Sequence, residues 1–313
     1  MPASGKLSIA ARRAAYGGAK SVLSAIGFRF EIHRRNVHQI GMWRWRRRGS
    51  ALPRSPRRLV LIPGLGDSAL TWMLTLAPAL PSLHGTYDEV VFLEMPGFEG
   101  ALFDEKPFDS MDDLLATAFD CLERLRPRVI CGHSLGGWIA SAYSVRPRAK
   151  HLPSEVVLLA PSGVGGSRQE KLLWKAKFDR ALKGDAEQFK KHVFVREPLV
   201  FRLFPNALQD FFARKEIRRF VASIREDHFV EKKLKGFRPR ATIVWGDRDT
   251  LNPFHWAEYW AKGLGPKKSR VFQLQGVGHN LHLENPLTTL STLVPLLWGR
   301  QGWLRFHPRV LPR

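Results

Sequence analysis

Cysteine is scarce in this sequence, since its 313 residues include only Cys121 and Cys131. Two cysteines cannot make a disulfide framework, and without a CxxC pair they exclude a cysteine-rich zinc site. A reducing compartment is therefore expected, and we predict a cytoplasmic location. Long apolar runs are lacking as well, because none approaches the about 18 residues that a membrane-spanning helix needs.

Acidic residues are few, with 28 Asp and Glu against 50 Lys and Arg, and the formal net charge is +22. Residues 1–58 contain 14 Lys or Arg and one acidic residue, while four arginines and no acidic residue follow Glu284. Both ends of the chain are therefore cationic. Solvated basic tails explain this pattern, and attraction to an anionic membrane surface or an acidic partner is the alternative. No nucleic-acid-binding motif accompanies the charge, so nucleic acid is not expected as a partner.

The two ends of the chain are predicted to lie outside the folded core. Residues 1–27 are basic, rich in small residues and free of acidic ones, and form an N-terminal extension. They lack the continuous apolar segment of a signal peptide. Three interpretations stay open: a simple basic extension, a helix lying on a membrane, and an organellar transit peptide. Residues 299–313 form a basic C-terminal tail.

From residue 59 onward, short apolar runs alternate with helix-like segments. Near-continuous runs of Val, Ile and Leu are typical of parallel strands that are buried on both faces. Their alternation with helices predicts an α/β fold with a doubly wound, mostly parallel sheet, formed by residues 28–164 and 238–298. We expect strands at 28–33, 41–46, 59–62, 90–93, 129–131, 156–160, 241–245 and 271–274, and helices at 68–80, 110–125, 135–146 and 286–297.

One interval breaks this alternation. The 80 residues between Ala160 and Ala241 contain no strand signal, and a structureless loop of that length is improbable. Lys, Arg, Phe and Leu recur at helical spacing over residues 169–182 and 207–224. Residues 165–237 are therefore predicted to form a helical cap, inserted after the sixth strand.

The strongest chemical signal is the sequence Gly132-His133-Ser134-Leu135-Gly136. It is a G-x-S-x-G motif between an expected strand and an expected helix, which is the setting of a nucleophile elbow. The small residues around the serine leave room for strained backbone angles. The N–H group of Leu135, at the start of the helix, is well placed to stabilise a developing oxyanion.

A serine hydroxyl is a weak nucleophile and needs a neighbouring base. Two later segments provide candidates directly after expected strands: Gly246-Asp247-Arg248-Asp249, and Gly278-His279 followed by Glu284 and Pro286. Carboxyl ends of parallel strands form the edge at which open α/β sheets build their sites. A serine, an aspartate and a histidine are therefore expected at one edge.

These motifs resemble those of the α/β-hydrolase family, over about residues 28–298. The resemblance implies that Ser134 is the nucleophile, His279 the base, and Asp249 the acid that orients the imidazole. Asp247 is the alternative acid. His282 is expected to pack or to line the pocket.

The family also has a second oxyanion donor, in the loop after the third strand. Here that loop reads Pro63-Gly64-Leu65, where the family often has His-Gly. The contact comes from the backbone, so the proline does not exclude it, and the N–H group of Leu65 is the best candidate.

The resemblance predicts a serine hydrolase of carboxylesterase or lipase type, acting on a small-molecule or lipid ester with an apolar acyl group. Amidases or peptidases, thioesterases and C–C bond hydrolases use the same fold, which does not choose among them. A binding protein without catalysis is a further alternative, against which the complete set of three residues counts. We expect no cofactor and no metal. A peripheral contact of the basic termini with an anionic membrane remains an expectation.

Overall fold

We analysed a computed structural model, which describes residues 18, 21–46, 49, 51–95, 107–198, 201–202, 205–299 and 309–310. Most of the two basic ends predicted from the sequence lies outside these residues. The end of the N-terminal extension does not: residues 21–25 are helical, and Leu23 is buried in the hydrophobic core. The last part of the predicted extension therefore packs against the folded core.

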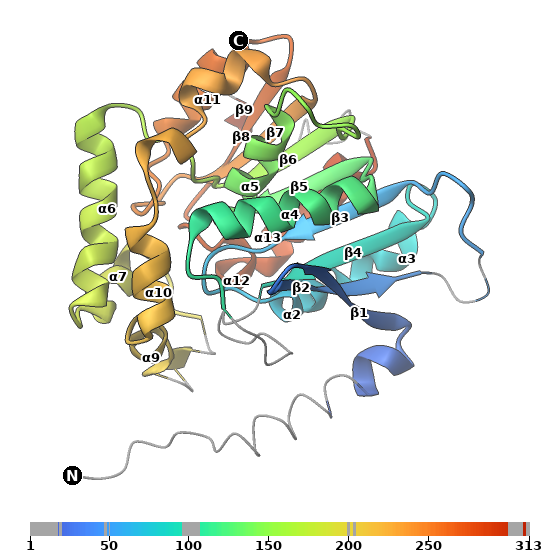
Figure 1. Ribbon diagram of the computed structural model, residues 1–313, viewed down its shortest axis with the longest axis horizontal. Coiled ribbons are helices and arrows are strands. Elements are labelled where there is room, and N and C mark those ends of the chain that lie inside the picture. Colours follow the sequence, from blue (N-terminus) through green and yellow to red (C-terminus); the bar gives the residue numbers. More distant parts are fainter. Residues whose placement is uncertain are drawn as a thin grey trace.

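A nine-stranded sheet forms the centre of the molecule (Figure 1), in the order β1-β2-β4-β3-β5-β6-β7-β8-β9. The six strands from β4 to β8 in this order are parallel, while β1, β2 and β9 pair antiparallel. The predicted mostly parallel sheet is confirmed. The short ninth strand, within the predicted C-terminal tail, was not expected. The strands are β1 (Phe28–Arg35), β2 (His38–Trp45), β3 (Arg58–Ile62), β4 (Glu89–Glu94), β5 (Val129–His133), β6 (Glu155–Leu159), β7 (Arg240–Gly246), β8 (Ser269–Leu274) and β9 (Arg309–Val310).

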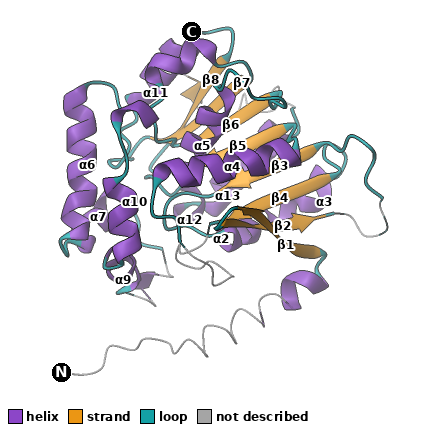
Figure 2. Cartoon of the chain, in the orientation of Figure 1, coloured by secondary structure: helices purple, strands orange, loops and turns teal. Residues whose placement is uncertain are grey.

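Helices cover both faces of the sheet (Figure 2). Helices α4 (Met111–Leu125) and α5 (Leu135–Ser144) lie on one face, and α2 (Ala69–Leu76) and α13 (Pro286–Leu297) lie on the other. The core also contains η1 (Ala77–Ala79), α3 (Leu80–Leu83), α11 (Trp256–Leu264) and α12 (Leu281–Glu284). The helix expected over 68–80 is shorter than predicted, because prolines at the starts of η1 and α3 cannot continue an α-helical hydrogen-bond ladder.

Part of the N-terminal positive charge has a structural role. Glu89 is fully buried in the sheet, and its carboxylate pairs with Arg44, Arg46 and Arg58. These partners outweigh the effect of burial and lower the pKa of Glu89 to about 2. A buried carboxylate is tolerated when it is paired and hydrogen-bonded. Three of the basic residues before position 59 therefore stabilise the fold.

The insertion between β6 and β7 is helical, and it lies beside the sheet at the left of Figure 1. Its aromatic side chains pack mainly on one another: Phe178 contacts both Phe189 and Phe212 edge to face, and Phe194 packs on Phe201. Phe204, a further aromatic residue of the insertion, lies outside the described residues. The elements are α6 (Arg168–Leu182), α7 (Ala186–Val193), α9 (Ala207–Phe212), α10 (Lys215–Ala222), η2 (Glu226–His228) and η3 (Glu231–Gly236).

The segment 207–224, in which residues recur at helical spacing, forms two helices and not one continuous helix. The chain leaves α9 at Ala213, and Arg214 has extended backbone angles before α10 begins. Phe212 in α9 and Phe220 in α10 are both buried, one on each side of the break. Across the described part of the chain, no helix has the length and apolarity that crossing a bilayer would require.

Candidate active site

Ser134 lies at the turn between β5 and α5. Its backbone angles are φ 51° and ψ −113°, which are strained for a residue with a side chain. The turn depends on glycine neighbours. A Cβ atom on Gly132 would lie 2.4 Å from the carbonyl oxygen of Gly136, and one on Gly136 would lie 2.1 Å from that of Ile62. The tight turn thus presents Ser134 at the carboxyl edge of the sheet.

Three side chains meet at the carboxyl ends of β5, β7 and β8. His279 Nε2 lies 2.8 Å from Ser134 Oγ, and His279 Nδ1 lies 2.8 Å from Asp249 Oδ2. All three residues are buried. Because a carboxylate can only accept, Nδ1 carries the imidazole proton and Nε2 accepts the proton of the serine hydroxyl. The arrangement is therefore able to take a proton from Ser134.

The two aspartates after β7 have different surroundings. Asp249 Oδ1 accepts the backbone N–H groups of Leu251 and Asn252, both at 2.9 Å, which leaves Oδ2 for the histidine. Asp247 instead accepts the backbone N–H of Gly276 at 2.6 Å and so joins two loops. The structure brings Asp249, and not the alternative Asp247, to the imidazole.

The two candidate oxyanion donors belong to segments that lie close to Ser134. Leu135 is the first residue of α5, so its N–H group has no carbonyl partner within the helix. The loop before Leu65 passes close to Ser134, since a Cβ atom on Gly64 would lie 3.3 Å from Ser134 Cβ. The loop that contains Leu65 and the start of α5 therefore both lie beside Ser134.

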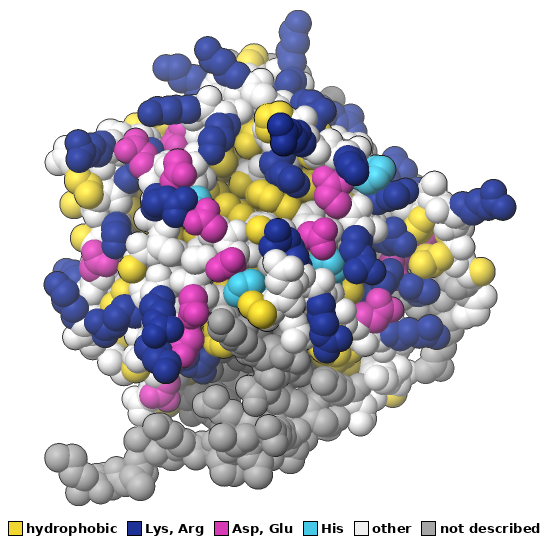
Figure 3. All heavy atoms as spheres, viewed as in Figure 1, with side chains coloured by type: hydrophobic (Ala, Val, Ile, Leu, Met, Phe, Trp, Pro, Cys, Tyr) yellow, Lys and Arg dark blue, Asp and Glu magenta, His cyan; other side chains and the backbone are white. Residues whose placement is uncertain are grey.

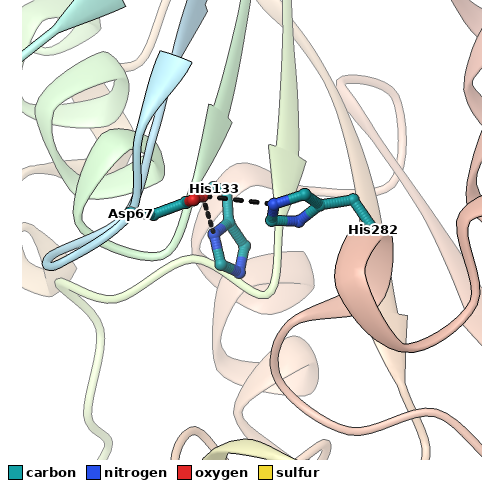
Figure 4. Close-up of side chains that lie close together, drawn as sticks. All are labelled: Asp67, His133 and His282. Carbon is teal, nitrogen blue, oxygen red and sulfur yellow. Dashed lines mark ion pairs between the residues drawn. The ribbon is translucent and has the colours of Figure 1, made fainter. Parts of the chain in front are cut away.

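A buried cluster lies behind the elbow, where Asp67, His133 and His282 converge (Figure 4). Asp67 accepts hydrogen bonds from the Thr71 hydroxyl at 2.7 Å and the Trp72 indole N–H at 2.9 Å. His282 Nε2 lies 3.3 Å from Asp67 Oδ2, and its ring stacks on Trp72. His282 is therefore a packing residue, as expected.

His133 connects this cluster to the proposed base. Its Nε2 lies 3.0 Å from the carbonyl oxygen of His279, to which it must donate because a carbonyl only accepts. Its Nδ1 lies 3.9 Å from Asp67 Oδ2. Burial lowers the pKa of His133 to about 3, so the ring is neutral. Burial opposes the charge of Asp67, but its interaction with His282 and the hydrogen bond from Thr71 outweigh burial and lower the pKa of Asp67 to about 2.

The same three residues form a group that could in principle hold a metal ion, with ligand atoms within 4.8 Å of one another. Protein donors already occupy both oxygens of the Asp67 carboxylate, including the backbone N–H of Ser68 at 2.8 Å. We therefore interpret the group as a hydrogen-bonded support behind Ser134.

The insertion contacts the loop that carries His279. The carbonyl oxygen of Val193 accepts the backbone N–H of His279 at 3.1 Å. Glu284 Oε2 accepts the backbone N–H groups of Val195 and Arg196 at 2.9 and 3.2 Å. The position of the histidine loop is thus tied to the end of α7.

Sequence reasoning missed Ser162 and Asn252, which contact two of the three central side chains, and Asp67, which lies in the cluster beside them. Ser162 Oγ lies 3.4 Å from Ser134 Oγ, and the Asn252 side chain donates to Ser162 Oγ at 3.0 Å. Their only signal in the sequence is that each closely follows an expected strand. No spacing rule distinguishes them from ordinary loop residues.

Known proteins share this architecture. A model of the alpha/beta hydrolase family matches residues 59–292. The solved structure of lip1 from Acinetobacter baumannii AYE, which carries a lipase name, is 19% identical, with 90% of this chain and 96% of that chain covered and a TM-score of 0.68. Naproxen esterase from Bacillus subtilis is 15% identical, with 93% and 99% covered and a TM-score of 0.66.

A third structure, carboxylesterase CesB from Bacillus subtilis, is 16% identical, with 92% of this chain and 99% of that chain covered and a TM-score of 0.65. None of the curated proteins compared with this chain matches it. At these identities the solved structures share the fold, while the family model covers most of the chain. The chain belongs to the alpha/beta hydrolase family.

Proposed function

We propose that this hydrolase cleaves carboxylic esters with an apolar acyl group, and that Ser134, His279 and Asp249 are its catalytic triad. The observation that carries the proposal is the continuous hydrogen-bonded line from Asp249 through His279 to Ser134. Its proton directions are those that activate a serine nucleophile.

The proposed reaction has two stages. Ser134 Oγ attacks the ester carbonyl while its proton passes to His279 Nε2, and the N–H groups of Leu65 and Leu135 stabilise the oxyanion. The imidazolium then protonates the departing alcohol, which leaves an acyl-enzyme. Water attacks this ester in the second stage, and His279 accepts the proton of the water and returns a proton to Ser134.

An ester is favoured over the other bonds that this fold can cleave. Structural neighbours with esterase and lipase names support it, as does the aromatic interior of the insertion, which we propose is a cap over an apolar substrate. The insertion also carries 18 Lys and Arg against 10 Asp and Glu over residues 165–237. Such a cap is poorly suited to the free ammonium group of a peptide substrate.

We also propose that the protein contacts an anionic lipid surface. Leu172 and Leu173, on the outer side of α6, are 60% and 59% exposed. Arg168, Lys175 and Arg180 belong to the same helix. Apolar side chains among cations are the combination that docks a helix on an anionic bilayer.

Hydrolysis of p-nitrophenyl esters from acetyl to palmitoyl tests the catalytic proposal. We expect turnover that depends on chain length and is lost in Ser134→Ala. Asp249→Asn should lower kcat by about 10⁴-fold, as expected when the imidazole loses its orienting acid. Asp247→Asn is the matched control and should retain near wild-type kcat.

Two outcomes would contradict this proposal. If the folded protein cleaved none of these esters but Ser134 still reacted with a fluorophosphonate, the substrate would be an amide, a thioester or a C–C bond. If Ser134 failed to react as well, the protein would be a binding protein with a hydrolase fold.

A further inference from the structure

Ser162 is a second hydroxyl beside the proposed nucleophile. It lies in the loop after β6, is only 4% exposed, and its Oγ is 3.4 Å from Ser134 Oγ. The loop is fixed closely against the elbow. The backbone N–H of Ser162 donates to the carbonyl of Ser134 at 3.0 Å, and a Cβ atom on Gly137 would lie 2.7 Å from Pro161 Cβ.

The direction of each hydrogen bond around Ser162 follows from groups that can only donate. The indole N–H of Trp174 donates to Asn252 Oδ1 at 3.0 Å, which identifies the other side-chain atom of Asn252 as its NH2 group. That NH2 group donates to the Ala160 carbonyl and to Ser162 Oγ, both at 3.0 Å. Ser162 Oγ therefore accepts from Asn252, and its own proton is available for another partner.

That partner is Ser134. The proton of Ser134 Oγ is already directed to His279 Nε2, so in the contact between the two hydroxyls Ser162 is the donor. The backbone N–H of Asn252 also donates to Asp249 Oδ1. The backbone and the side chain of Asn252 therefore close a ring of hydrogen bonds. The ring runs from Asp249 through His279, Ser134 and Ser162 back to Asn252.

The backbone next to Ser162 is strained. Ala160, at the end of β6, has a φ of 40°, which is unfavourable for a residue with a side chain. Its carbonyl oxygen is held by the Asn252 amide. Strained backbone that is held by its surroundings is common at functional sites.

From this geometry we infer that Ser162 is a further catalytic residue of the proposed reaction, donating a hydrogen bond to Ser134 Oγ. During attack, the Oγ–carbon bond forms as the Ser134 proton passes to His279, and Oγ carries partial negative charge. During deacylation, the same oxygen is the leaving group and receives a proton from the imidazolium. Ser162 keeps its own proton throughout.

The resting distance of 3.4 Å suits this role. A hydrogen bond of that length is weak, so it does not lower the nucleophilicity of Ser134 before substrate binds. A donor whose bond strengthens as charge develops stabilises the transition state more than the ground state. Asn252 and Trp174 are positioning residues, because they act through Ser162.

Ser162→Ala and Ser162→Thr test the inference, which rests on the proposed ester hydrolysis. Ser144→Ala is the matched control, since Ser144 also carries a buried hydroxyl, which donates to a helix carbonyl. The measurements are kcat and KM on the best p-nitrophenyl ester, and the rate at which a fluorophosphonate labels Ser134.

We expect Ser162→Ala to lower both kcat and the labelling rate about tenfold or more with little change in KM, as for loss of one hydrogen bond to a charged oxygen. Ser162→Thr should restore most of the rate, and Ser144→Ala should leave it unchanged. Trp174→Phe should slow the wild type but have little further effect in the Ser162→Ala background.

The inference is overturned if Ser162→Ala turns over and is labelled within twofold of the wild type, or if it loses only thermal stability. A wild-type protein whose Ser134 neither hydrolyses esters nor reacts with the fluorophosphonate would reject the proposed function itself, and the role of Ser162 with it.

Discussion

At the scale of single residues, the neutral histidine next to Ser134 should make the fold sensitive to acid. Burial lowers the pKa of His133 to about 3, from an ordinary value of 6.5. Unfolding exposes the ring, so between these two pH values the unfolded chain binds a proton that the folded chain does not. The free energy of unfolding should therefore fall as the pH falls through this window, by about 1.4 kcal/mol per pH unit from this group alone.

His133→Gln tests this expectation, because glutamine does not titrate and keeps an N–H donor for the His279 carbonyl. Denaturant unfolding of both proteins at several values between pH 7 and pH 4 gives the slopes. We expect the variant to lose less stability with falling pH than the wild type. Equal slopes would mean that His133 does not control the acid response.

For single residues, the sequence predicted where the side chains of the proposed triad lie. It did not predict which residues contact them. Ser134, Asp249 and His279 each follow a strand, and parallel strands bring their carboxyl ends to one edge. Asn252 reaches Ser162 and Asp249 together only because the loop after β7 folds back on itself. No local sequence pattern predicts such a contact.

At the scale of elements, one glutamate links the insertion to the loop that carries His279. Glu284, at the end of α12, accepts two backbone N–H groups from the chain that follows α7. Burial raises the pKa of its carboxyl group above the ordinary value. The two N–H groups stabilise the charged form in opposition to burial, so the contact depends on an acceptor oxygen at this place.

Glu284→Ala removes that acceptor, and the two exposed backbone N–H groups must turn to water. We expect a loss of about 1–3 kcal/mol in the free energy of unfolding and a lower kcat, because the loop of His279 loses a support. Glu284→Gln keeps one acceptor oxygen and should lie between the alanine variant and the wild type. Glu187→Ala, at an exposed position on α7, is the control and should change neither quantity.

A normal kcat in a destabilised Glu284→Ala protein would show that this contact supports the fold without positioning the histidine. Denaturant unfolding and ester turnover on the same preparations distinguish the two results.

The positions of the strands along the chain and the site of the insertion were predictable, because continuous apolar runs and the long gap after 160 are local signals. The lengths of helices were less so. Prolines shorten the helix expected over 68–80, and the break at Arg214 in the segment 207–224 follows from tertiary packing of phenylalanines on both sides. The pairing of β9 with β8 is likewise a long-range contact.

At the scale of the whole molecule, some of the positively charged side chains are paired inside the fold, and others face solvent. Glu89 holds three of the N-terminal arginines. Figure 3 shows other Lys and Arg side chains spread over the face in view, with no single concentrated patch. Dispersed cations attract an anionic surface at long range but do not orient the molecule. An exposed apolar segment such as that of α6 would supply the orientation.

Sedimentation with vesicles separates these two contributions. We expect binding to phosphatidylglycerol vesicles that weakens as salt is added, because the charges are exposed, and little binding to phosphatidylcholine vesicles. The double variant Leu172→Glu and Leu173→Glu should bind less than the wild type at every salt concentration. Leu74→Glu, at an equally exposed leucine on α2, is the control.

Removal of residues 1–17 leaves the buried Leu23 in place and measures the contribution of the N-terminal charges. If the α6 variant bound like the wild type while the truncation abolished binding, the N-terminal segment and not the insertion would be the membrane contact.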